Sequence, residues 1–89
     1  PWPHRLVLLV PPRAFPEKKT GVVAFNIVNG TIRDAIRPIV LSMGDKYRLE
    51  VIDLYELTEP HPEYFDDGVH PNGIGNHAIA EYLYQTLEI

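Results

Sequence analysis

The sequence predicts an α/β fold, namely the C-terminal portion of a three-layer α/β/α sandwich with a parallel sheet, in the order β-α-β-loop-α. Three observations predict it. Two short apolar runs, at residues 5–10 and 49–55, have the length of strands, and residues 27–43 between them show helical periodicity. Two strands joined by one helix form a βαβ unit, whose strands are parallel and whose crossover is right-handed.

The first expected strand is Arg5–Val10, a continuous apolar run that Pro11 and Pro12 end abruptly. A strand with one wet face alternates apolar and polar residues, whereas a strand that does not alternate is covered on both faces. We therefore expect a central parallel strand with helices on both sides. The following residues, 11–20, contain three prolines and mixed charges, which is typical of a loop.

The expected helix rests on apolar residues that recur at spacings of three and four. Pro38 falls inside this pattern, and an interior proline removes a backbone hydrogen bond, so we expect a kink near Asp34–Pro38. Gly44-Asp45 follows the last periodic residue and is the expected end of the helix. The periodic residues are Ile27, Val28, Ile32, Ala35, Ile36, Ile39, Val40 and Met43.

The second expected strand is Leu49–Tyr55, and a polar, proline-punctuated loop follows it from Glu56 to Asn72. An irregular loop of that length inside a compact domain is usually functional. The last expected element is an amphipathic helix over Gly73–Leu87 that packs back on the sheet. Two buried-type strands need neighbours on both edges. We therefore expect residues 1–89 to be the C-terminal segment of one domain whose N-terminal part is absent from the chain.

Composition and charge exclude several classes of function. The 89 residues are 45% hydrophobic and carry a net charge of −4, and Lys18-Lys19 is the only adjacent basic pair, so nucleic-acid binding is disfavoured. The longest apolar run, Leu6–Val10, is too short to span a bilayer. Cysteine is absent, which excludes disulfides, thiolate metal sites and cysteine nucleophiles but leaves the compartment open.

The candidate catalytic residues are Asp67 and His70, in the loop after the second expected strand. Ligands of open parallel sheets bind beyond the carboxyl ends of the strands, where this loop lies. Asp67-Gly68 is a turn signal that can fold the carboxylate onto the ring of His70. An imidazole held by a carboxylate keeps the tautomer needed to take a proton from a serine hydroxyl. We expect His70 at the surface, at the floor of a cleft.

Other residues near this turn have two interpretations each. Asp66 could replace Asp67 as the orienting acid, but the three-residue spacing to the histidine favours Asp67 and a solvated Asp66. Arg13, just beyond the first strand, could line a substrate cleft or be a solvated loop residue. Tyr64 and Phe65 could anchor the loop by core packing, which we favour, or stack on a sugar or acyl group.

A metal site is disfavoured, although the loop and the last helix together hold several potential ligands. The spacings of His61, Asp66, His70 and His77 match no metal-binding pattern. We expect His77 to belong to the terminal helix instead.

The segment Asp67-Gly68-Val69-His70-Pro71-Asn72, with Gly75 and Ile79-Ala80 after it, resembles the last conserved block of the SGNH (GDSL-type) hydrolases. The residues Leu8-Leu9-Val10-Pro11-Pro12 resemble the fourth strand of that family and its proline-rich exit. The residues Val51-Ile52-Asp53-Leu54-Tyr55 resemble its fifth strand. The similarity covers most of the chain in the family's order.

The resemblance implies a serine esterase with a Ser-His-Asp catalytic triad, in which Asp67 is the orienting acid and His70 the general base. It implies no metal or organic cofactor. The family's serine stands in a Gly-Asp-Ser block and its oxyanion hole in two middle blocks, all absent here, and Ser42, the only serine, falls in the helical pattern. The implied partner is therefore an upstream part of the same domain that carries the serine, and we expect the isolated chain to be inactive.

The implied substrate is a small ester or an acetylated carbohydrate, so the leading hypothesis is a carbohydrate O-acetylesterase or small-ester hydrolase. Acyl transfer to another hydroxyl would use the same residues. The alternative from a different class is a non-enzymatic α/β binding or scaffold module with a degenerate active site. The presence or absence of an upstream Gly-Asp-Ser block distinguishes these two classes.

Overall fold

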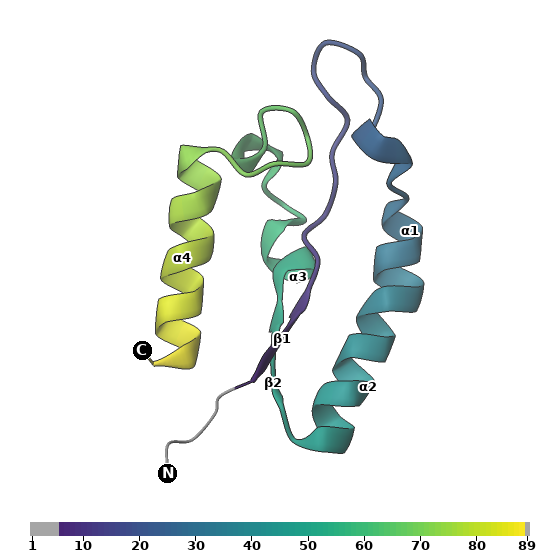
Figure 1. Cartoon of the computed structure of the whole chain (residues 1–89). Coiled ribbons are helices and arrows are strands. Elements are labelled where there is room, and N and C mark those ends of the chain that lie inside the picture. Colours follow the sequence, from purple (N-terminus) through teal and green to yellow (C-terminus); the bar gives the residue numbers. More distant parts are fainter. Residues whose placement is uncertain (1–5, 89) are drawn as a thin grey trace.

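The computed structural model describes residues 6–88 as two parallel strands with helices against them (Figure 1). Strand β1 spans Val7–Val10 and strand β2 spans Glu50–Asp53, and Val7 pairs with Glu50 at one end and Val10 with Asp53 at the other. In Figure 1 the strands lie between helix α2 (Arg37–Tyr47) and helix α4 (Gly73–Leu87). The predicted α/β class with a parallel sheet is confirmed.

The expectation that β1 is covered on both faces is wrong for the described residues. Val10 is fully buried, in a core cluster with Ile32 and Tyr55, whereas Leu9 is 49% exposed. Successive side chains of a strand point to opposite faces. One face of β1 is therefore packed within this chain, and the face that carries Leu9 is partly open.

The helical segment between the strands is continuous but irregular. It begins with α1 (Asn29–Thr31), passes through the π-helical turn η2 (Ile32–Ile36) and continues as α2. Pro38, the second residue of α2, has no N–H to bond the carbonyl of Asp34, so the turn before it departs from α-helical geometry. The distortion predicted near Asp34–Pro38 is thus present as a π-helical turn.

The predicted end of this helix at Gly44-Asp45 is wrong, because α2 continues to Tyr47. The chain leaves the helix through Arg48, whose φ of 54° is left-handed. Gly44 is instead a packing residue, since a Cβ at this position would clash with the Cγ2 of Val51. Glycine therefore allows α2 to approach β2 closely, and it does not end the helix.

The second strand is shorter than the predicted Leu49–Tyr55, because the chain turns into helix α3 (Leu54–Thr58) directly after Asp53. The Asp53 carboxylate accepts a hydrogen bond from the backbone N–H of Glu56 at 3.1 Å and caps this helix. Leu54 and Tyr55 are buried as expected, but on a helix. A short apolar run fits a buried strand and a buried helix equally well.

The remaining elements are two 3₁₀ turns, η1 (Ala24–Asn26) and η3 (Pro62–Tyr64), and the terminal helix α4, whose predicted bounds are confirmed. Helix α2 packs on both strands, while α4 packs mainly against η3. Within residues 6–88 no helix is long and apolar enough to cross a membrane.

Candidate active site

The candidate site is the turn at residues 66–70, whose flanking residues are hydrogen-bonded to each other. Phe65 and Pro71 form an antiparallel bridge, and the N–H of Asn72 donates to the carbonyl of Tyr64 at 2.7 Å. This green loop lies at the end of the sheet towards which both strands run (Figure 1). The turn thus occupies the carboxyl edge, where ligands of parallel sheets bind.

Asp67 and His70 are in direct contact. Oδ2 of Asp67 lies 2.6 Å from Nδ1 of His70, while Oδ1 accepts hydrogen bonds from the backbone N–H groups of Val69 at 2.9 Å and His70 at 2.7 Å. With the carboxylate at Nδ1, the ring carries its proton there, and Nε2 is available as a proton acceptor. The contact that the three-residue spacing predicts is present.

The same contacts act on the ionisation of Asp67. The backbone N–H of His70, the His70 ring and the N–H of Val69 together lower the pKa of Asp67 from 3.8 to about 2. Donors that point at a carboxylate favour its charged form. Asp67 is therefore an anion at neutral and mildly acidic pH.

Gly68 sets the shape of the turn. Its φ is +90°, and its carbonyl accepts a hydrogen bond from the N–H of Phe15 at 2.8 Å. A Cβ at this position would clash with the carbonyl of Phe15. The loop after β1 and the turn therefore meet backbone to backbone, which only glycine permits.

The residues around the turn hold it in place. Asn72 caps α4 by accepting from the N–H of Gly75 at 2.8 Å, and its amide donates to Oδ1 of Asp66 at 2.9 Å. Asp66 is thus exposed and bound to Asn72, whereas the ring of His70 is held by Asp67. A Cβ at Gly75 would lie 2.6 Å from the carbonyl of Tyr64, so this glycine lets α4 start close to the turn.

The aromatic residues before the turn have structural roles. Phe65 is 3% exposed and packs against Phe15, with ring centroids 5.6 Å apart. Tyr64 stacks on His61 at 4.4 Å. The anchoring interpretation therefore holds for Phe65, whose ring is buried in the protein interior. The stacked pair of Tyr64 and His61 braces the base of the same loop.

The aromatic side chain beside the candidate base is one that sequence reasoning missed. The ring of Phe25 lies 6.1 Å from the ring of His70, and the two planes are nearly perpendicular, at 89°. Phe25 is 76% exposed, so most of its ring is accessible beside the histidine. It is 45 residues away in the chain and belongs to no periodic pattern, so no local signal in the sequence indicates the contact.

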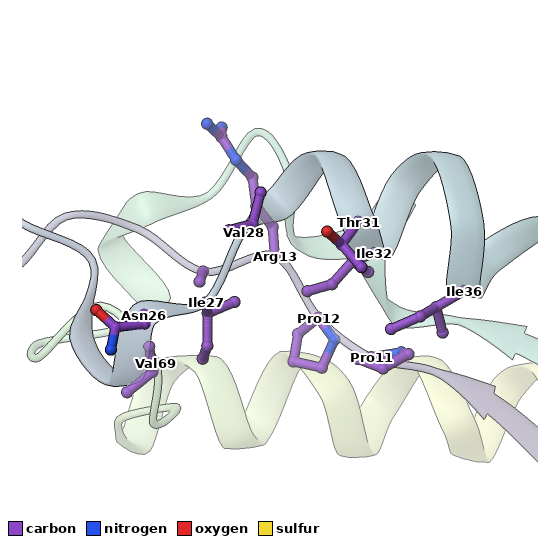
Figure 2. Close-up of a pocket in the computed structure, with 11 residues that line it drawn as sticks. Pro11, Pro12, Arg13, Asn26, Ile27, Val28, Thr31, Ile32, Ile36 and Val69 are labelled. Carbon is purple, nitrogen blue, oxygen red and sulfur yellow. The ribbon is translucent and has the colours of Figure 1, made fainter.

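A cavity of about 500 Å³ lies next to the turn, between the loop after β1 and the start of the helical segment. Figure 2 shows Asn26 and Val69 at one end of it and Ile36 at the other. His70 is well exposed, as predicted, but it does not line this cavity; its neighbour Val69 does. That His70 forms the floor of a cleft therefore stays a prediction, because this cavity is lined by its neighbour and not by His70 itself. The lining residues are Pro11, Pro12, Arg13, Ala14, Asn26, Ile27, Val28, Thr31, Ile32, Ile36 and Val69.

Arg13 is one of the residues that line the cavity, but its guanidinium group lies over the ring of Phe15. Its guanidinium points away from Pro11 and Pro12 in Figure 2, and its Cζ lies 4.8 Å from the ring centroid of Phe15. Its Nε is buried and has no hydrogen-bond partner in the structure. The backbone N–H of Arg13 donates to the hydroxyl of the buried Thr58 at 3.0 Å, which ties the β1 exit to α3.

Two further histidines, His61 and His77, and the serine Ser42 lie outside the turn. Nδ1 of His61 pairs with Glu63 at 2.8 Å, and Nε2 of His77 lies 3.5 Å from Glu81 on α4. Among residues 6–88, no three His, Asp or Glu side chains gather in a way that could hold a metal ion. Ser42 lies in the middle of α2, as its place in the helical pattern predicts, and the structure shows that it is exposed.

The chain resembles part of one known esterase. Over 66 residues, 73% of its length, it is 33% identical to an acetylxylan esterase of Xylanibacter ruminicola, of which the match spans 14%. No family model matches the chain, and no solved structure matches it. The similarity indicates an esterase-related region.

Proposed function

We propose that this chain is the C-terminal part of an SGNH-type ester hydrolase domain and supplies the aspartate and the histidine of a Ser-His-Asp triad. The single observation that carries the proposal is the 2.6 Å contact between Oδ2 of Asp67 and Nδ1 of His70, made by an exposed pair at the carboxyl edge of a parallel sheet. The similarity to an acetylxylan esterase supports it. The nucleophilic serine would come from an upstream part of the same domain.

In the proposed reaction, Nε2 of His70 takes the proton of the serine hydroxyl while the serine oxygen attacks the ester carbonyl. The protonated ring then gives that proton to the leaving alcohol oxygen, and an acyl-serine remains. A water molecule, deprotonated by the same nitrogen, releases the carboxylic acid and restores the serine. Asp67 stabilises the imidazolium in both halves of the reaction and stays ionised throughout.

The proposed substrate class is a carbohydrate O-acetyl ester. It rests on the relative, which is described as an acetylxylan esterase. The geometry of Asp67 and His70 would serve any ester whose alcohol oxygen reaches Nε2, so the histidine does not determine substrate specificity. Specificity would come from the groups around Nε2.

The test uses the full-length protein that contains this chain and measures acetate release from acetylated xylo-oligosaccharides. We expect the wild type to release acetate and His70→Ala to lose at least about a thousandfold in kcat. His77→Ala is the matched control, because it removes an exposed histidine of α4 that pairs with Glu81 and lies outside the turn. Full activity in His70→Ala would overturn the mechanism.

A wild type without any acetate release would instead support the binding or scaffold alternative. An upstream sequence without a Gly-Asp-Ser block would point the same way. Acyl transfer to a second hydroxyl is separated from hydrolysis by adding a free xylo-oligosaccharide and following whether the acetyl group moves to it.

A further inference from the structure

We infer that Phe25 is a sugar-binding residue, whose exposed ring packs against the pyranose ring that carries the scissile acetyl group. The inference rests on the proposed function and names a substrate contact of the same site. Three observations carry it: the contact of Phe25 with His70, the exposure of its ring, and the conformation of its backbone.

The contact between the rings of Phe25 and His70 places Phe25 near the position of the leaving group. In ester hydrolysis the histidine must protonate the leaving alcohol oxygen, which requires that oxygen within about 3 Å of Nε2. For an acetylated sugar, the leaving alcohol is the sugar itself. The sugar ring must therefore sit directly beside His70. The ring centroid of Phe25 lies 6.1 Å from that of His70, so Phe25 is close enough to contact a sugar ring bound there.

The backbone of Phe25 adopts a conformation that non-glycine residues rarely adopt. Phe25 has φ 60° and Asn26 has φ 55°, so two successive residues are left-handed. This conformation is uncommon for a bulky residue and tends to occur at functional sites. Burial does not account for it, because the side chain is 76% exposed.

The chemistry of the ring matches a pyranose. The faces of a pyranose carry C–H groups, which pack on the electron-rich face of an aromatic ring, while its hydroxyls remain in water at the edge. The space beside the site is also larger than an acetyl group requires. Asn26 and Val69, the chain neighbours of Phe25 and His70, line the cavity of about 500 Å³, a volume typical of small-molecule sites.

The test compares two esters with the full-length protein. An acetylated xylo-oligosaccharide has a sugar as its leaving group, whereas ethyl acetate has no ring to stack. We expect Phe25→Asn to raise KM for the sugar ester about tenfold and to leave kcat/KM for ethyl acetate within about twofold. Asparagine is chosen because it tolerates the left-handed conformation at this position. Phe25→Trp, which keeps an aromatic face, should retain a KM near that of the wild type.

The matched control is Val22→Ala, which removes another exposed apolar side chain, 65% exposed, from the segment just before η1. It should leave both substrates unaffected. An equal loss on both esters in Phe25→Asn, through kcat, would show that Phe25 positions His70 and would overturn the inference. An unchanged KM for the sugar ester would also overturn it. If the wild type hydrolyses neither ester, the proposed function fails, which is distinct from both results.

Discussion

Asp67 uses one carboxylate oxygen for His70 and the other for its own turn: Oδ2 contacts Nδ1 of the ring at 2.6 Å, and Oδ1 accepts from two backbone N–H groups. The residue that would orient the base is therefore also the residue that shapes the turn. A substitution at Asp67 can act on either role, and the choice of replacement separates them.

Asp67→Asn should lower kcat by about 10³- to 10⁴-fold, and by less than His70→Ala, while the turn remains folded. Asparagine keeps an oxygen for the backbone N–H groups of Val69 and His70, but its amide can offer a donor to Nδ1 in place of an acceptor. The proton would then move to Nε2, which could no longer act as the base. Steady-state kinetics with an acetate ester measures the loss.

The matched control is Asp66→Asn, because Asp66 accepts a hydrogen bond from Asn72, whereas the ring of His70 is held by Asp67. It should be close to wild type. A large loss in Asp66→Asn together with normal activity in Asp67→Asn would move the orienting role to Asp66.

The depressed pKa of Asp67 predicts how the turn responds to acid. Its folded value of about 2 lies below the ordinary 3.8, so the ionised form is favoured by folding. This stabilisation is fully present above about pH 4 and is lost as the pH falls through about 2. Carbon-13 NMR of the side-chain carboxyl in the full-length protein should show a midpoint well below 3.8. A midpoint at the ordinary value would contradict the hydrogen-bond geometry described for Asp67.

Gly68→Ala should destabilise the protein by about 1–3 kcal/mol and reduce activity, for two reasons. Alanine is strained at the φ of +90° found here, and its Cβ would clash with the carbonyl of Phe15. Gly73→Ala is the control. Gly73 opens α4, and a Cβ there meets no atom within 4 Å, so alanine should be neutral or slightly stabilising. Thermal unfolding of both variants checks the prediction, and equal midpoints would show that the turn can move away from the loop after β1.

The parts of the fold that the sequence predicts are those with a local signal. The double proline after Val10 and the three-residue spacing of Asp67 and His70 are such signals, and both predictions agree with the structure. The end of α2 was mispredicted because Gly44 serves packing against Val51, a contact between different elements. The contact of Phe25 with His70 likewise joins residues that are far apart in the sequence, and no periodicity within residues 20–30 could indicate it.

The apolar surface of the described residues bears on whether residues 1–89 fold alone. Among residues 6–88, the largest fully buried side chains are Ile52, Val10 and Thr58, while Leu9 on β1 is 49% exposed. Helix α2 exposes an apolar stripe of Ile39, Met43 and Tyr47, at spacings of four residues along one face, with exposed fractions of 59%, 43% and 57%. An isolated pair of strands is at best marginally stable without further strands or a well-packed helix face.

We therefore predict that residues 1–89 alone show no cooperative thermal transition and that adding the upstream part of the domain restores one. The physical reason is that the open face of β1 and the apolar stripe of α2 stay in water in the isolated chain, so burial cannot offset the entropy of ordering the backbone. Circular dichroism against temperature and the dispersion of amide NMR signals measure it. Leu9→Thr and Met43→Gln should destabilise the full-length protein if these side chains are covered there, whereas Tyr84→Gln, at a 63% exposed position on α4, serves as the control. A sharp transition and dispersed amides from residues 1–89 alone would show instead that the small core around Val10 is sufficient.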